Sequence, residues 1–317
     1  MGKKRIASAG FVLAAVILNI LVILSDALPV LSKVGCCVAI VVAAAIGVCC
    51  TEDLLRIPLE IFRDRGMFLA IVKNDFQARL AGSYLGLFWA YVQPVITLCL
   101  YWFVFQFGLR AGNVSDHPFI LYLMAGLIPW FYFSESWGGA SGSLVEYSYL
   151  VKKVVFNVNF LPVIKVCSAL FVHLVFVCIV TILSLVYGYG IHPWLLQIFY
   201  YMLCNMVLVL GISYITAACT VFFRDMTQIV NIFLTMGIWI TPIMWNPEAT
   251  LSRKLLMIFR LNPMYYIVDG FRDSLLDKVW FWEKPVWSIY FWCFAIVVYL
   301  LGVRMFNRLK VHFSDVL

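Results

Sequence analysis

Few side chains that could carry acid–base chemistry lie inside the apolar stretches of this sequence. Glu135 lies within the apolar run 119–143, and His173 lies within the run 160–187. An ionisable group inside a membrane span marks a site for protons, ions or substrate. A single acid without a second is a poor proton relay, however, and the serines on either side of Glu135 could satisfy it. Two interpretations of Glu135 therefore stay open, a functional acid and a satisfied structural one.

Motifs of several enzyme classes are absent from the sequence. It contains no G-x-x-x-x-G-K-[ST] loop, so this chain carries no P-loop ATPase site, and neither H-E-x-x-H nor G-x-S-x-G occurs. There is no Asp-x-Asp pair of the kind that holds a metal in nucleotide-sugar transferases. The ten cysteines lie in apolar runs, and the four histidines are scattered. We expect no catalytic residue, no metal site and no cofactor in this chain.

The composition is typical of a polytopic membrane protein. The chain has 317 residues, of which 64% are hydrophobic and only 12% charged, and its mean hydropathy is +0.97. The net charge of +7 fits basic cytoplasmic loops and does not indicate nucleic-acid binding. The predicted fold class is an all-α polytopic membrane protein with about eight transmembrane helices.

Two apolar runs near the N-terminus, 6–24 and 34–50, precede the other spans. The first resembles a signal peptide, but its apolar core is long and no clear cleavage site follows, which favours an attached helical hairpin over 1–52. The six later spans are expected at 84–108, 119–143, 160–187, 194–222, 227–245 and 286–306. The segment 246–285 is too polar to span and rich in aromatic residues, which favours short re-entrant or surface-lying helices.

Lysine and arginine in the short loops set the expected orientation. One side holds most of them, including Lys3, Lys4, Arg5, Arg56, Lys152, Lys153, Arg224 and Arg308, whereas the short loops of the other side hold only Lys33 and Arg110. We therefore predict that both termini and the loop 146–159 are cytoplasmic, and that 246–285 is extracytoplasmic.

The stretch 53–83 predicts an interfacial helix that feeds directly into a span. Its apolar residues recur at spacings of three and four, whereas its charged residues fall on other faces. The apolar set is Phe68, Leu69, Val72, Phe76 and Leu80, and the polar set is Lys73, Asp75, Gln77 and Arg79. Such a helix could be a moving part, or it could only anchor the span that follows.

The loop 146–159 contains a candidate docking face for another protein. Tyr149, Lys152, Lys153 and Phe156 share one side of a helix at spacings i, i+3, i+4 and i+7. Two aromatic rings and two lysines facing the cytoplasm could dock another protein. The alternative is a solvated basic loop that only sets topology.

Aromatic residues make up 17% of the chain. Tyr101 and Phe105 share a helix face, as do Trp130 and Trp137. Most such residues form interface belts or pack in the core, but some could line a path for sugars, whose C–H faces stack on aromatic rings.

Five motifs in this order resemble the membrane subunits of ABC exporters of the ABC-2 type, which move O-antigen, capsule or teichoic-acid polymers. The resemblance runs from about residue 59 to the C-terminus. The motifs are KNDFQARLAGSYLGLFWAYVQP at 73–94, AGLIPW at 125–130 with FSE at 133–135, LVKKVVF at 150–156, VFFRDM at 221–226, and TPIMW at 241–245 followed by LNPMYYIVDGFRD at 261–273. Two features depart from the family: the hairpin 1–52 is extra to the usual six spans, and Leu80 stands where an aromatic residue is usual.

The resemblance implies roles for particular residues. The helix in 53–83 would be a cytoplasmic gate helix, with Phe68, Val72, Lys73, Asp75, Phe76 and Arg79. The segment 146–159 would be the coupling helix that docks on the ATPase, through Tyr149, Lys152, Lys153 and Phe156. A sugar path would be lined by Trp89, Tyr101, Phe105, Trp130, Phe131 and Trp137. Glu135 and the loop pair Arg224 and Asp225 belong to the family pattern, with no role assigned, and 84–317 would be the transmembrane domain.

The implied function is that of a permease subunit for lipid-linked polysaccharide in a prokaryotic cytoplasmic membrane. It implies two copies of this chain and two copies of a separate P-loop ATPase, which binds ATP and Mg²⁺. An ABC-2 exporter of drugs or small lipids is an alternative, as is a membrane-embedded glycosyl- or acyltransferase.

Overall fold

The computed structural model describes residues 51–78, 88–110, 112–114, 116–152 and 156–317, together with Gly86 and single positions between Val12 and Ala45. The predicted hairpin over 1–52 lies largely outside the described residues. Among the predicted site residues, Arg79 and Lys153 also lie outside them.

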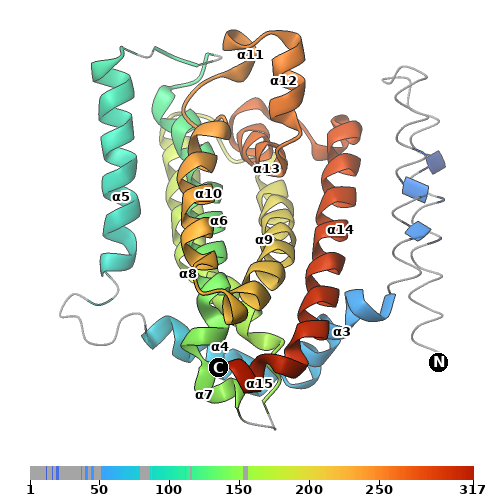
Figure 1. Ribbon diagram of the computed structural model, residues 1–317. Helices are drawn as coiled ribbons and strands as arrows, with labels where there is room; N and C mark the ends of the chain where they lie inside the picture. The colour runs from blue at the N-terminus through green and yellow to red at the C-terminus, as the bar shows by residue number, and fades with distance from the viewer. Residues whose placement is uncertain are drawn as a thin grey trace.

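Long apolar helices dominate the structure (Figure 1). Five helical stretches are long and apolar enough to cross a membrane: Phe88–Gly108, Phe119–Glu146, Phe160–Val186, Pro193–Phe222 and Pro285–Val316. A sixth apolar helix, α10 (Met226–Ile240), has 15 residues and is therefore about 22 Å long, shorter than a bilayer's hydrocarbon core of about 30 Å. The five stretches overlap five of the six later predicted spans, whereas α10 ends five residues before the end of the predicted span 227–245. The chain is a multi-pass membrane protein.

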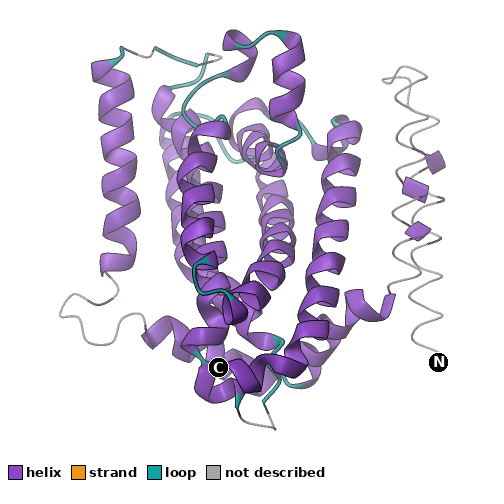
Figure 2. Ribbon diagram, in the orientation of Figure 1, coloured by secondary structure: helices purple, strands orange, loops and turns teal. Residues whose placement is uncertain are grey.

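Figure 2 draws no strand in the described part of the chain. An apolar segment surrounded by lipid must satisfy its own backbone N–H and C=O groups, and a helix does so within one segment. The predicted all-helical class is confirmed.

The centre of the bundle is α6 (Phe119–Glu146), which packs against α8 (Phe160–Val186), α9 (Gln197–Phe222) and α10. The helix α14 (Pro285–Leu309) packs closely on α9. A Cβ atom added at Gly211 of α9 would lie only 2.8 Å from the backbone N of Tyr299 on α14. The absence of a side chain at Gly211 therefore permits this close approach, as is common between membrane helices.

The helix α5 (Phe88–Phe103), extended by the π-helical turn η1 (Val104–Gly108), stands at the left of the bundle in Figure 1. It contacts the bundle through Leu98, which is buried in the core, and through aromatic side chains. The ring centroids of Tyr91 and Phe176 lie 5.9 Å apart, and those of Tyr101 and Trp239 lie 6.4 Å apart.

Short helices cover the two ends of the bundle (Figure 1). At the lower end lie α3 (Thr51–Arg63), α4 (Arg65–Ala78), α7 (Ser148–Val151), the turn η5 (Lys310–His312) and α15 (Phe313–Val316). At the opposite end lie α11 (Pro247–Thr250), α12 (Arg253–Arg260) and α13 (Pro263–Arg272). The loop 146–159 and the segment 246–285 thus lie at opposite ends of the bundle.

The segment 246–285 forms the short helices that its polarity and aromatic content predict. Asn262 caps α13 by accepting a hydrogen bond from the Met264 N–H at 3.0 Å, and Pro263 occupies the first turn, where its missing N–H costs nothing. A π-helical turn η3 (Asp273–Asp277) and a 3₁₀ turn η4 (Phe281–Glu283) follow, and another 3₁₀ turn, η2 (Pro193–Leu196), precedes α9.

Candidate functional site

A cavity of about 480 Å³ opens between α5 and α6. Helical spacing explains its lining, because Trp89, Gln93 and Thr97 recur every four residues on one face of α5. From α6 come two such pairs, Trp130 with Ser134 and Phe131 with Glu135; Ala90 and Pro94 of α5 complete the lining.

The cavity combines aromatic faces with hydrogen-bonding groups. Trp89, Trp130 and Phe131 supply rings, and Gln93, Thr97, Ser134 and Glu135 supply amide, hydroxyl and carboxylate groups. Pro94 has no N–H and cannot donate to the carbonyl of Ala90 one turn earlier. Rings that cover C–H faces, next to polar groups that bind hydroxyls, suit a polyhydroxylated ligand.

The predicted path residues divide into two groups. The first group, Trp89, Trp130 and Phe131, lines this cavity together with the acid Glu135. The second group makes other contacts: Tyr101 meets Trp239, Phe105 stacks on Phe119 at 5.8 Å, and Trp137 Nε1 donates to Thr216 Oγ1 at 3.3 Å. The histidine singled out from the sequence, His173, is buried and stacks on Tyr132 at 4.7 Å.

The interfacial helix is α4, and its faces differ from the prediction. Phe68 and Val72 are buried as expected, and Phe68 meets Phe160 of α8 edge-on at 5.8 Å. Lys73 is exposed, but Leu69 of the apolar set is exposed as well. The placement of Asp75 on a polar outer face is wrong, because Asp75 is buried against α8.

A lysine of α8 explains why a carboxylate is buried there. Lys165 Nζ lies 2.7 Å from Asp75 Oδ1 and 2.6 Å from Glu146 Oε1, and Tyr147 OH donates to Asp75 Oδ1 at 2.5 Å. The side chains of Lys165 and Asp75 are only 6% and 1% exposed, whereas that of Glu146 is 56% exposed. Burial alone would raise the pKa of Asp75, but hydrogen bonds from Lys165 and Tyr147 outweigh it and hold that pKa below its usual range.

The coupling segment predicted over 146–159 begins at this network. After the end of α6, the described helical part of this segment is the turn α7, from which Tyr149 is exposed. Lys152 is exposed beyond it, and Phe156 is partly buried. The described members of the predicted docking face therefore include two side chains that a partner can reach.

The far end of the same segment contacts α3. Asn157 Nδ2 donates to Glu60 Oε2 at 2.7 Å, and Asn159 Nδ2 donates to the same oxygen at 3.3 Å. These bonds and one from Arg56 lower the pKa of Glu60 against the opposing effect of burial. Tyr214 OH also donates to the carbonyl of Asn159 at 2.7 Å. Both ends of the segment 146–159 are thus bonded to α3 or α4.

The loop pair Arg224 and Asp225 lies in the turn between α9 and α10, and both side chains are exposed. The Arg224 carbonyl accepts a hydrogen bond from Thr227 Oγ1 at 3.1 Å. Figure 1 places this turn at the same end of the bundle as α4. The structure gives this pair no contact with the cavity lining.

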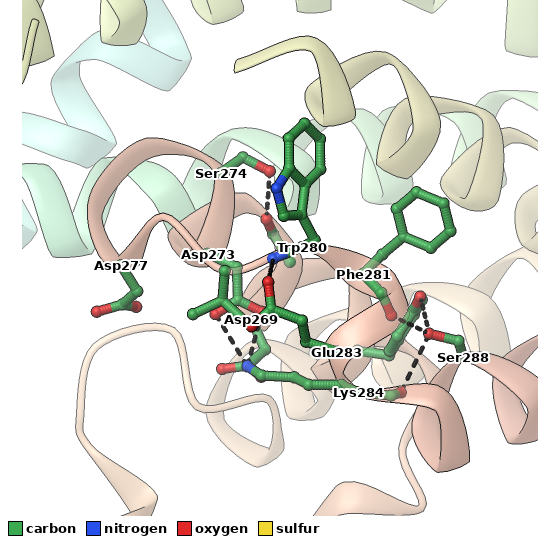
Figure 3. Close-up of polar contacts among 12 residues, drawn as sticks. Asp269, Asp273, Ser274, Asp277, Trp280, Phe281, Glu283, Lys284 and Ser288 are labelled. Carbon is green, nitrogen blue, oxygen red and sulfur yellow. Dashed lines mark hydrogen bonds and ion pairs between the residues drawn. The ribbon is translucent and has the colours of Figure 1, made fainter. Parts of the chain in front are cut away.

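A second charged cluster lies at the opposite end, around α13 (Figure 3). Lys284 Nζ lies 2.8 Å from Asp269 Oδ2 and 2.6 Å from Asp273 Oδ2. Burial and the neighbouring Asp269 raise the pKa of Asp273 to about 7. The cluster borders a cavity of about 160 Å³ that also touches Arg260, whose guanidinium pairs with Glu248 at 2.7 Å.

Sequence reasoning missed Lys165, Glu146, Glu60 and Lys284. The signal for Lys165 was present, since it is a lone charge near the start of an apolar helix. The described residues contain no group of three His, Cys, Asp or Glu side chains that could hold a metal ion.

Comparison with known proteins gives consistent matches. The family described as ABC-2 type transporter matches residues 67–276. An O-antigen export system permease protein RfbA of Myxococcus xanthus is 30% identical over 223 residues, which cover 69% of this chain and 84% of that protein. A protein of the same description from Klebsiella pneumoniae is 26% identical over 255 residues, which cover 79% of this chain and 95% of its own length.

Proposed function

We propose that this chain, which belongs to the ABC-2 type transporter family, is the membrane subunit of an exporter of lipid-linked polysaccharide. The observation that carries the choice of a sugar polymer is the cavity between α5 and α6, where Trp89 and Trp130 lie beside Gln93, Thr97 and Glu135. Aromatic faces next to amide, hydroxyl and carboxylate groups suit successive sugar units, which present C–H faces and hydroxyls in turn. The similarity to O-antigen export permeases points to the same class of substrate.

Energy for export comes from a separate ATPase subunit, which binds ATP and Mg²⁺. The sequence of this chain contains no P-loop. Tyr149 and Lys152 are exposed at the end of the bundle where α4 also lies, and they form the docking face for that ATPase. The chain resides in the cytoplasmic membrane with this end and both termini in the cytoplasm, as the distribution of lysine and arginine favours.

Two copies of the chain form the pore, each with its own ATPase. The cavity is lined by two helices of one chain and is only partly enclosed. The helix α10 carries a row of large exposed apolar residues: Ile229, Ile232, Phe233, Met236, Trp239 and Ile240. A second copy packed against this face would close the path, and α4 would gate its cytoplasmic entrance.

Deleting the gene in its host tests the proposed function. The cell should then retain lipid-linked polymer on the inner side of the membrane and display none outside, and the intact gene should restore display. Normal polymer display together with loss of drug efflux would favour the exporter of drugs or small lipids. Loss of polymer synthesis itself would favour the transferase.

A matched pair of tryptophan and phenylalanine variants tests the path. Trp89 and Phe88 are neighbours on α5 and equally exposed at 56%, but only Trp89 lines the cavity. We expect Trp89→Ala to reduce polymer display about tenfold, the factor that 1.4 kcal/mol of ring–sugar contact represents, and Phe88→Ala to leave it unchanged. Equal effects of both variants would contradict the proposal that the polymer passes through this cavity.

Charge reversal tests the docking face. Tyr149→Ala combined with Lys152→Glu should abolish co-purification of the ATPase while the spans stay folded. Arg253→Glu, on α12 at the opposite end of the bundle, is the control and should keep the ATPase bound. A double variant that still co-purifies with the ATPase would contradict the docking face.

A further inference from the structure

Lys165 lies between two parts of the chain that the proposed transport cycle has to connect. It projects from the first turns of α8. One of its partners, Glu146, is the last residue of α6 and is separated from α7 by Tyr147 alone. The other, Asp75, belongs to α4. The ammonium thus bridges the start of the coupling segment and the gate helix.

We propose that Lys165 is a positioning residue that transmits displacement of the coupling segment to α4 through its ion pairs with Glu146 and Asp75. The inference rests on the proposed function, because it needs an ATPase that moves the coupling segment. Tyr147 supports the same link, since its hydroxyl donates to Asp75 and its ring lies 5.0 Å below the Lys165 ammonium.

Burial makes the link stiff. The Lys165 and Asp75 side chains are almost fully enclosed, so solvent screens their attraction little, and separating them would leave two charges uncompensated. Glu146 is half exposed at the other end of the network, where the ATPase would approach. A displacement of residues 146 and 147 is therefore cheaper if α4 follows than if the pair breaks.

A second contact keeps the coupling segment from pivoting freely. At its other end Asn157 and Asn159 donate to Glu60 of α3, and α3 runs into α4 after a single residue, Asp64. With both ends bonded to the α3–α4 pair, the segment moves with these helices as a unit. Of the two contacts, only the Lys165 network includes a residue of the gate helix α4 itself, Asp75.

The decisive variant removes the link without leaving a buried charge. Lys165→Met alone strands Asp75, so loss of folding is a risk, whereas Asp75→Asn combined with Lys165→Met removes both buried charges together. The complex with the ATPase in lipid vesicles is used for every variant. The control is Arg260→Gln with Glu248→Gln, which neutralises an ion pair at the opposite end of the bundle.

The expected result is uncoupling. The double variant at 75 and 165 should assemble with the ATPase and hydrolyse ATP at the wild-type rate, but export much less polymer per ATP hydrolysed. The control pair should keep the wild-type ratio. A double variant with the wild-type ratio, or a control that loses the ratio equally, would overturn the proposal.

A distance measurement separates this inference from the identity of the substrate. Spin labels at Asn74→Cys on α4 and Arg308→Cys on α14, both exposed and placed in a background without native cysteines, report movement of α4. We expect ATP to change this distance in the otherwise wild-type complex and not in the double variant, with or without polymer. An ATP-dependent change that persists in the double variant, or is absent from the wild type, contradicts the role of Lys165 even if polymer export is established.

Discussion

At the scale of the residue, Phe76 is one of the side chains that pack α4 against α8. Its ring lies 5.1 Å from that of Phe171 on α8, so this face of α4 is packed on the bundle. A carboxylate at this apolar contact loses water and gains no hydrogen-bond partner from the Phe171 ring. We predict that Phe76→Asp abolishes export or lets ions leak, with the protein still in the membrane, as measured by polymer display and membrane potential.

Gln77→Asp is the matched control for that change, because Gln77 is the next residue and is exposed. It adds the same charge without burying it and should leave export intact. Normal export and a tight membrane in Phe76→Asp would reduce α4 to an anchor.

Asp273 makes the folding stability of the protein depend on pH, and the direction of this dependence follows from its raised pKa. Its pKa is raised to about 7 by burial and by Asp269, with Asp277 adding to the effect and Lys284 opposing it. The unfolded chain, with an ordinary aspartate pKa of about 4, holds no proton here between about pH 4 and 7, but the folded protein does. Stability from this group is therefore greatest at low pH and is lost as the pH rises through about 7.

Thermal unfolding in detergent checks this prediction. Between about pH 5 and 8 the Tm of the wild type should fall as the pH rises, and Asp273→Asn should flatten that slope. The same slope in both proteins would show that Asp273 stays ionised throughout.

Site residues that belong to a short sequence motif can be predicted from the sequence. Residues whose partners lie far away in the sequence cannot. Trp89, Trp130 and Glu135 belong to recognisable motifs, and the structure brings them to one cavity. Lys165 belongs to no such motif, and its partners Asp75 and Glu146 lie 90 and 19 positions away. Only the packing of α4 and of the end of α6 on α8 reveals that these charges meet.

At the scale of the element, the packing of α9 on α14 depends on Gly211. A side chain there would press on the backbone of Tyr299. We predict that Gly211→Val lowers the free energy of unfolding by about 1–3 kcal/mol. Gly142→Val in α6 makes the same change where a Cβ would meet nothing within 4 Å, and its Tm in detergent should stay close to that of the wild type.

Hydropathy is enough to predict the spans but not the faces of the short helices. Five of the six later spans come directly from apolar length, and this signal is independent of tertiary contacts. The pattern for α4 predicts an outward Asp75, because a periodicity separates polar from apolar residues without knowledge of a buried partner. Leu69 differs from the prediction in the opposite way: the pattern predicts a buried side chain, but this one is exposed. An apolar residue at a membrane interface can face outward.

At the scale of the whole molecule, the two ends of the bundle have different chemistry. The end with α3, α4 and α7 joins a buried ion network to exposed residues that suit a partner. The end with α12 and α13 holds the Lys284 cluster, and the cavity between α5 and α6 lies along the membrane-spanning part. This arrangement fits the proposed exporter, in which an ATPase binds at the end with α3, α4 and α7 and the polymer passes along the membrane-spanning part.

The most direct test of that account is ATP-driven translocation by the purified complex. The chain and its co-purified ATPase are placed in lipid vesicles with lipid-linked polysaccharide from the host, and polymer that has crossed is measured by its protection from an added glycosidase. We predict transfer that requires ATP, that falls about tenfold in Trp89→Ala and that is unchanged in Phe88→Ala. Active ATP hydrolysis with no polymer transferred would contradict the account.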